Sequence, residues 1–99
     1  FGIANKFEEL SHRRSDNIIR IIRMRKVTFI DATGIHNLEI FIKAAQDEGK
    51  IIILSGVNES VHAAIQQAGI VDMVGKENVL DHIHKALARA EQVAETINN

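Results

Sequence analysis

The sequence predicts an α/β domain with a small, mostly parallel central sheet and about four helices. Two runs rich in β-branched residues, 18–24 and 50–54, have the composition of strands. Both runs are nearly continuous in apolar residues rather than alternating, which is typical of strands covered on both faces. Segments with helical spacing alternate with them along the chain, and this order favours parallel strands covered by helices.

The composition limits the classes of function. A chain of 99 residues forms one domain. Its formal net charge of −1 provides no field that would attract nucleic acid, and it has no Trp or Tyr on which bases could stack, so we expect no nucleic-acid partner. The absence of Cys excludes disulfide and thiolate chemistry and fits a reducing, cytosolic compartment. The apolar runs are too short to cross a bilayer.

The chain begins with the pattern of a short helix. Its apolar residues Ile3, Phe7 and Leu10 recur at helical spacing. The polar residues 11–17 then predict a loop, and Ile18–Met24 predicts the first buried strand.

The next predicted unit is a strand, a short turn and a helix. Val27–Ile30 is a further β-branched run that ends at Asp31, and the apolar period then changes from strand to helix. This helix continues to about Glu48, and Gly49 is a usual residue just past a helix end. Functional groups of open α/β sheets usually lie at the carboxyl ends of strands, which makes the turn at 31–34 the first candidate site.

The second half of the chain repeats the alternation. Lys50–Leu54 predicts a buried strand, and Asn58 can cap the helix that follows the turn at 55–58. Gly69 ends that helix. The apolar face of the helix consists of Val61, Ala64, Ile65 and Ala68.

The last segment holds one short apolar run and one long helix. Residues 70–74 predict a weak or edge strand, and 75–78 predict a turn. The final helix starts at Val79 or Leu80 and continues to Ile97, with the longest and most regular apolar pattern in the chain.

The turn Asp31-Ala32-Thr33-Gly34 has two interpretations. In the functional one, the helix N-terminus and the Thr33 hydroxyl form a phosphate site or a phosphorylation site. In the structural one, Asp31 or Thr33 caps the helix and Gly34 lets the chain turn. The residues by themselves favour the structural interpretation, because no lysine follows Gly34 and no Gly-x-Gly-x-x-Gly pattern is present.

The other polar residues form no recognisable reactive set. His82 and His84 are two apart on the expected helix, so we expect them to diverge, and no histidine has a ligand partner at metal spacing. His36 lies just inside the helix after the turn and is expected to face solvent. No serine has the context of an activated nucleophile, and no carboxylate pair is indicated. The sequence therefore predicts an interaction or regulatory module, not an enzyme, with no metal and no cofactor.

A family resemblance is carried by residues 22–36, Ile-Arg-Met-Arg-Lys-Val-Thr-Phe-Ile-Asp-Ala-Thr-Gly-Ile-His. This stretch resembles the central segment of STAS domains, the sulfate-transporter and anti-sigma-factor-antagonist family. It is most similar to the cytosolic STAS domain of SulP-type anion permeases. Residues 1–7, 53–57 and 81–87 resemble the entry to the family's first helix, its next strand and its last helix, so the resemblance covers nearly the whole chain.

The resemblance implies a STAS-like fold with helices largely on one side of the sheet. It also implies a regulatory or scaffolding domain at the cytoplasmic face of the inner (plasma) membrane, within a secondary active transporter of sulfate-type anions. The implied partners are the transmembrane domain of the same transporter and a regulatory protein. We expect residues 1–99 to be one STAS domain, a piece lacking one or two N-terminal strands, since residue 1 is Phe.

The resemblance also gives the site residues. The candidate interaction turn comprises Asp31, Ala32, Thr33, Gly34 and His36, with Ser55 and Gly56 expected nearby. The antagonist branch of the family is switched by phosphorylation of a serine directly after the motif's aspartate. That position is Ala32 here, which leaves Thr33 as the only hydroxyl in the turn.

Two alternatives remain open at this point. The first is a free-standing anti-sigma-factor antagonist that binds a kinase and is phosphorylated at Thr33. The second is a nucleotide-binding module that uses the helix N-terminus.

Overall fold

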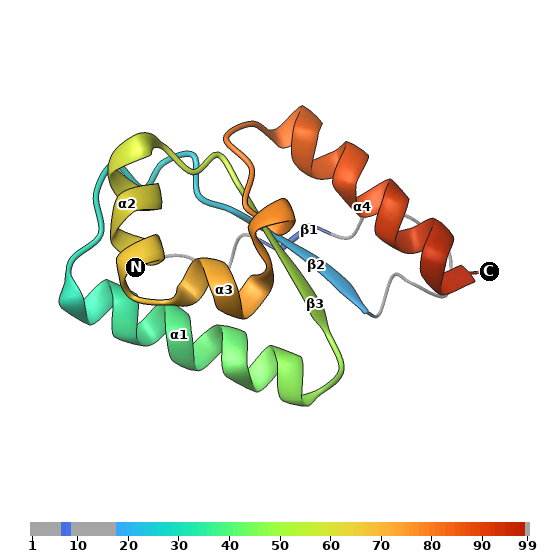
Figure 1. Cartoon of the computed structure of the whole chain (residues 1–99), viewed down its shortest axis with the longest axis horizontal. Coiled ribbons are helices and arrows are strands. Elements are labelled where there is room, and N and C mark those ends of the chain that lie inside the picture. The colour runs from blue at the N-terminus through green and yellow to red at the C-terminus, as the bar shows by residue number, and fades with distance from the viewer. Residues whose placement is uncertain (1–6, 9–17, 99) are drawn as a thin grey trace.

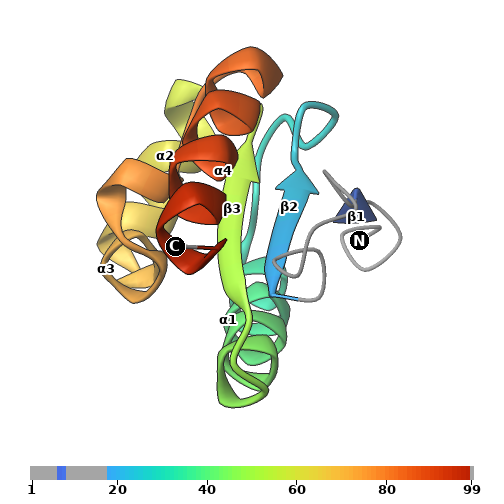
Figure 2. The same ribbon diagram turned by 90° about the vertical axis from the view of Figure 1, so that its right-hand side faces the viewer.

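The computed structural model describes residues 7–8 and 18–98, and they form a three-stranded sheet with helices on both faces (Figure 1). The strands are β1 (Phe7–Glu8), β2 (Ile19–Arg23) and β3 (Ile51–Ser55), in the order β1-β2-β3. β1 pairs antiparallel with β2, whereas β2 and β3 are parallel. The α/β class and the mostly parallel centre of the sheet are therefore confirmed. Figure 2 shows the three strands side by side.

One helix connects β2 to β3, and the other three helices follow β3. They are α1 (Ala32–Asp47), α2 (Glu59–Gln67), α3 (Ile70–Val74) and α4 (Ile83–Asn98). A short 3₁₀ turn, η3 (Lys76–Asn78), precedes α4. None of the described helices has the length and apolar character needed to cross a membrane.

The larger core lies between the sheet and the helices α1, α2 and α3. Ile22, Ile52 and Leu54 of the strands are buried against it. Alternate residues of a strand point to opposite faces, so this set belongs to one face of the sheet. The helices contribute Leu38, Ile42, Val61, Ile65, Ile70, Val71 and Val74.

The smaller core lies on the opposite face, under α4 (Figure 1). Ile19, Ile21 and Ile53 of the strands belong to it. The side of α4 that faces them carries the buried alanines Ala86, Ala90 and Ala94, spaced four residues apart. Small side chains at this spacing place one side of the helix close to the sheet. Three helices, α1–α3, therefore cover one face of the sheet and α4 covers the other, which agrees with the implied arrangement of helices largely on one side.

The N-terminus of α1 is set by local chemistry. Asp31 has an extended backbone, and its carboxylate accepts a hydrogen bond from the Gly34 N–H at 2.8 Å. The residue before the cap, Ile30, and the fourth helical residue, Ile35, both pack against the larger core. This is the arrangement of a hydrophobic staple, which fixes the angle at which the chain enters a helix. The capping interpretation is therefore confirmed for Asp31.

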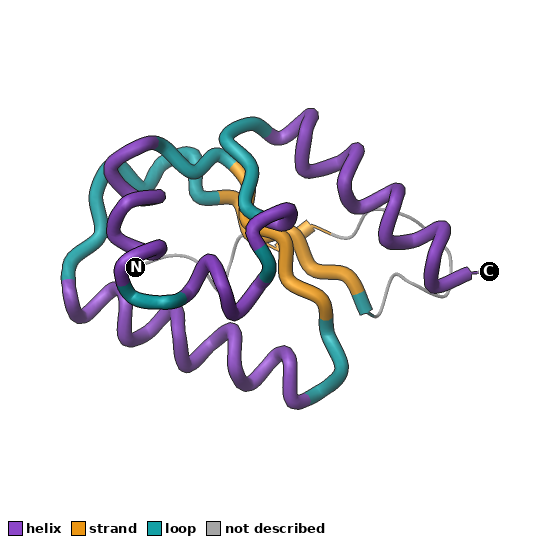
Figure 3. Tube along the Cα trace, in the orientation of Figure 1, coloured by secondary structure: helices purple, strands orange, loops and turns teal. Residues whose placement is uncertain are grey.

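Several predicted elements differ from the structure. Val27–Ile30 is not a strand: β2 ends at Arg23, and a loop with a turn at 25–26 leads from it to Asp31 (Figure 3). Residues 70–74 are the helix α3 rather than a weak strand. The last helix begins at Ile83, and Val79 instead makes an isolated parallel bridge with Leu54.

The start of the chain also differs. Phe7 and Glu8 belong to a strand, so the helix predicted over residues 3–10 is wrong at these two positions. The rest of that helix and the predicted loop at 11–17 lie outside the described residues.

Candidate functional site

The carboxyl ends of the parallel strands meet at one edge of the sheet. The Met24 N–H, just after β2, donates to the Ser55 carbonyl at the end of β3 over 2.8 Å. On the other side of β3, the Leu80 N–H donates to the Leu54 carbonyl over 2.8 Å. Three segments that are far apart in the sequence thereby form one edge, which is the usual place for a ligand in an open α/β sheet.

Gly56 lies at the centre of this edge. Its φ of +70° is a conformation that residues with a side chain rarely adopt. A Cβ at this position would lie 2.8 Å from the backbone nitrogen of Arg25 and 2.9 Å from the Arg25 Cα. A glycine is therefore needed both for the turn and for the close approach of the two strand ends.

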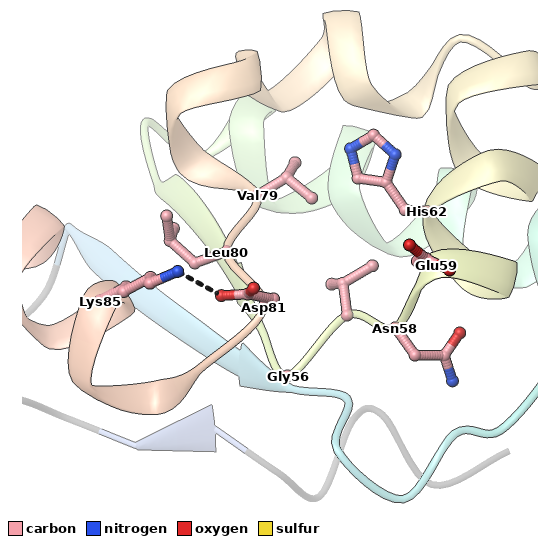
Figure 4. A pocket seen from close by; sticks show the side chains of 9 residues that line it. Gly56, Asn58, Glu59, His62, Val79, Leu80, Asp81 and Lys85 are labelled. Carbon is pink, nitrogen blue, oxygen red and sulfur yellow. Dashed lines mark ion pairs between the residues drawn. The ribbon is translucent and has the colours of Figure 1, made fainter.

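Among the described residues, two surface hollows adjoin Gly56. The larger, about 600 Å³ in volume, lies between the starts of α2 and α4 (Figure 4). Its polar lining consists of Asn58, Glu59, His62, Asp81 and Lys85. The smaller hollow is about 380 Å³ in volume. Its lining consists of Arg23, Arg25, Ser55, Gly56, Asp81, His82 and Ile83.

Asp81 lies between the two hollows and is paired with Lys85. The Lys85 Nζ is 3.0 Å from the carboxylate oxygen of Asp81 (Figure 4). The hydrogen bond from Lys85 and its positive charge lower the pKa of Asp81 below the ordinary value. Both side chains are about two-thirds exposed, so the pair adds little to stability. The pairing favours the ionised form of the Asp81 carboxylate, and the positive charge of Lys85 offsets the negative charge of that carboxylate.

The two histidines near the start of α4 were predicted to diverge, but in the structure their rings stack on each other. His82 precedes α4, and its ring stacks on that of His84 with the centroids 4.7 Å apart. The Nδ1 atom of His82 accepts a hydrogen bond from the His84 N–H at 3.1 Å. Among the described residues no group of three or more His, Cys, Asp or Glu side chains could hold a metal ion.

The predicted turn is the first turn of α1. Ala32, Thr33 and Gly34 are helical, and of these Gly34 is buried inside the helix instead of turning the chain with a positive φ. Asp31, Ala32 and Thr33 are exposed. His36 is also exposed, as predicted. The start of α1 is therefore exposed to solvent. It follows the loop 24–31, whereas the sequence predicted that it would directly follow a strand.

Ser55 and Gly56 belong to a different part of the same end of the molecule. Ser55 is only 1% exposed and ends β3, where its carbonyl bonds to Met24. The sequence placed Ser55 in the turn after the strand, but in the structure it is the buried last residue of β3. The link between this region and α1 is the loop 24–31.

Asn58 holds this loop. Its side-chain oxygen caps α2 by accepting from the Val61 N–H at 2.8 Å. Its side-chain nitrogen donates to the carbonyls of Val27 and Thr28, each at 3.2 Å. The next residue, Phe29, is 70% exposed. One side chain thus joins the start of α2 to the loop that leads to α1.

The architecture and this strand-end site invite comparison with known proteins. The sequence model of the STAS domain family matches residues 1–90. The chain belongs to the STAS domain family. The predicted resemblance is thereby confirmed.

Two solved structures agree with this fold. A sulfate transporter family protein from Wolinella succinogenes superposes with a TM-score of 0.73 at 43% identity, covering 78% of this chain and 63% of that one. The SulP transporter STAS domain from Vibrio cholerae gives a TM-score of 0.75 at 37% identity, covering 79% of this chain and 61% of that one. The match to SulP-type STAS domains was predicted from residues 22–36 and is confirmed.

The curated relatives are much longer proteins. Probable sulfate transporter 4.2 of Arabidopsis thaliana is 30% identical over 67 residues, which cover 68% of this chain and 10% of that protein. Sulfate transporter 4.1, chloroplastic, of the same plant is 28% identical over 78 residues, covering 79% of this chain and 11% of that protein. The STAS domain described here therefore spans about a tenth of the length of these transporters.

Sequence reasoning missed most of the residues that line the two hollows of this STAS domain. Arg25, Asp81 and Lys85 were not among the predicted site residues. Nothing in the local pattern places Arg25 beside Gly56 or His82, because the folding of the sheet brings these segments together. The one local signal was Gly56 itself, a glycine directly after a buried strand.

Proposed function

We propose that this STAS domain is the cytosolic regulatory and interaction domain of a secondary active transporter of sulfate-type anions. The observation that carries the proposal is the similarity to named sulfate transporters together with the matching SulP STAS structures. The domain contributes no catalysis of its own. It lies at the cytoplasmic face of the membrane, and its partners are the transmembrane domain of the same transporter and a regulatory protein.

The exposed first turn of α1 is the proposed contact surface. Asp31, Ala32, Thr33 and His36 are exposed at the start of a helix whose entry is fixed by a cap and by core packing. Such a rigid surface suits specific docking, since little conformational entropy is lost when a partner binds. In this proposal Gly34 is buried under the exposed residues, and Ser55 and Gly56, at the end of β3, do not touch the partner.

The test uses the full-length transporter in membrane vesicles. Thr33→Glu and His36→Glu place carboxylates on the proposed surface, and Lys43→Glu is the matched control on an exposed position further along α1. We expect sulfate uptake to fall in the first two variants, with unchanged protein amount, and to stay at the wild-type level in the control. Wild-type uptake in all three variants removes the first turn of α1 from the mechanism.

Phosphorylation of Thr33 is a second proposal for the same surface. The Thr33 residue is exposed in the first turn of α1, where a phosphate group would be stabilised by the helix N-terminus. Incubation with kinase extracts and mass spectrometry would detect the modified residue, and Thr33→Val is the control. If only other residues are modified, this proposal fails.

The remaining proposal is nucleotide binding by the isolated domain. Titration with GTP and ATP is the test, because a ligand that binds only the folded state raises the melting temperature. An unchanged melting temperature at millimolar nucleotide argues against a nucleotide cofactor.

A further inference from the structure

The first turn of α4 is capped by a histidine. The carbonyl of His82 accepts hydrogen bonds from the N–H groups of Lys85 and Ala86, each at 3.1 Å, so the helical hydrogen bonding of α4 begins at His82. The Nδ1 atom of His82 accepts a further bond at 3.1 Å from the N–H of His84, the second residue of the helix. Serine, aspartate or asparagine usually provides the side-chain acceptor for such an N–H at the start of a helix.

We propose that His82 is a pH-sensitive cap of α4: its neutral ring holds the first turn of the helix, and protonation of the ring as the pH falls from about 8 to about 5 releases that turn. The proposal concerns the folded domain itself and does not depend on the transporter function.

Protonation of His82 removes the cap directly. In the neutral ring with its proton on Nε2, the Nδ1 atom has a lone pair and accepts from the His84 N–H. In the charged ring both nitrogens carry protons, so Nδ1 can no longer accept. The N-terminus of a helix also carries a partial positive charge, which disfavours a cation there. The cap therefore contributes at high pH, and its contribution disappears as the pH falls through the histidine range.

The surroundings of the ring suit this role. His82 is exposed, so protons reach it from the solvent. Its ring stacks on that of His84 with the centroids 4.7 Å apart, which restricts the ring orientation and keeps Nδ1 directed at the helix start. If both rings are protonated, two like charges lie face to face, and their repulsion adds to the release of the turn.

The other charged groups around His82 keep their charge in this pH range. Arg23 and Arg25, at and after the end of β2, line the same hollow as His82, and a guanidinium group is not deprotonated in proteins. Asp81 stays ionised because Lys85 lowers the pKa of this carboxyl below the ordinary value. The attraction of Asp81 for a protonated ring is weakened, since Lys85 already pairs with it at 3.0 Å. Of these described groups, only the two histidines are of a type that changes charge between about pH 8 and pH 5.

Release of the cap acts on one turn and not on the core. None of the residues 83–85 is fully buried, whereas Ala86 is buried against the smaller core and anchors the rest of α4. Lys85 belongs to the released turn, so its ion pair with Asp81 loosens as well. The device therefore changes the carboxyl edge of the sheet with pH and leaves the packed interior in place.

The test is urea unfolding of the 99-residue chain at about pH 8 and about pH 5, compared with His82→Asn. Asparagine keeps a capping acceptor and does not titrate. We expect the unfolding equilibrium constant of wild type, relative to that of His82→Asn, to rise about fivefold between pH 8 and pH 5, the usual value of a helix cap. Nitrogen NMR of the ring at pH 8 should place the proton of His82 on Nε2.

Two further variants separate the cap from other histidine effects. His36→Asn is the matched control, an exposed histidine of α1 that caps no helix, and its ratio to wild type should change less than about twofold between the two pH values. His84→Gln removes the stacked ring and keeps the backbone N–H that His82 accepts, so most of the pH effect should remain.

Four results would overturn the proposal. They are an unchanged ratio for His82→Asn, an equal change for His36→Asn, loss of the effect in His84→Gln, and a proton on Nδ1 of the neutral His82 ring. A wild-type amide spectrum of each variant at pH 8, apart from signals near the substitution, shows that the fold is intact. None of these results bears on the transporter proposal, because the measurements require no membrane domain.

Discussion

The backbone of Arg25 lies against Gly56 so closely that a Cβ on the glycine would be 2.8 Å from the Arg25 nitrogen. This contact joins the ends of β2 and β3. It also accounts for a glycine whose φ is +70°.

Replacement of Gly56 by alanine is therefore expected to be strongly destabilising. The left-handed conformation costs an alanine about 1 kcal/mol, and the backbone collision adds about 1–3 kcal/mol. Gly49 is the matched control, because its φ is +81° but no atom lies within 4 Å of a Cβ built there. Urea denaturation should show a loss of about 1 kcal/mol for Gly49→Ala and a clearly larger one for Gly56→Ala. Equal losses would mean that the contact with Arg25 relaxes without cost.

Asn58 is expected to contribute through both ends of its side-chain amide. Asn58→Ala removes the cap of α2, worth about 1 kcal/mol, and two partly solvated bonds to the loop, worth about 0.5 kcal/mol each. Asn58→Asp keeps the capping oxygen and loses only the donors to Val27 and Thr28. Thermal and urea unfolding should rank the aspartate variant between wild type and alanine. An aspartate variant as unstable as the alanine variant would contradict the division of roles.

The alanine side of α4 is expected to reject larger residues. Ala90 is fully buried between α4 and the sheet, so Ala90→Leu should lower the free energy of unfolding by about 1–3 kcal/mol. Ala44→Leu makes the same change on an exposed position of α1 and should stay within about 0.5 kcal/mol of wild type. If denaturation shows no loss for Ala90→Leu, α4 is not tightly packed on the sheet.

The pair of Asp81 and Lys85 predicts a small, signed dependence on pH. The folded-state pKa of Asp81 is lowered by Lys85. Its contribution to stability is therefore present above the unfolded-state pKa and disappears as the pH falls through the lower folded-state pKa. Lys85→Met should raise the pKa of Asp81 in a carboxyl NMR titration, whereas Lys43→Met on α1 should leave it unchanged. An unaltered pKa in Lys85→Met would show that the pair does not persist in solution.

The sequence predicted those parts of the fold that local chemistry decides. Residue type and order were enough to predict the strands β2 and β3 and the helix caps Asp31 and Asn58. They were also enough to predict the glycines that follow α1 and α2. Each depends on neighbours within a few positions along the chain. These features could be read without any knowledge of the tertiary structure.

Tertiary structure decided the elements that sequence patterns missed. Four of the five residues of α3 are apolar, as in a strand, and a run so short does not distinguish helix from strand by periodicity. Val27 and Thr28 belong to no strand, and their carbonyls accept hydrogen bonds from the side chain of Asn58 instead of from a partner strand. The hollow beside Gly56 was missed for the same reason, since Arg25 and His82 meet only after the sheet has formed.

The hydrogen bonds at both ends of the Asn58 side-chain amide have a consequence for Phe29. The Asn58 side chain both caps the start of α2 and donates to the two carbonyls just before Phe29, so hydrogen bonds join the loop that carries this exposed ring to α2. A partner that binds Phe29 would therefore bind a loop that Asn58 already holds to the start of α2.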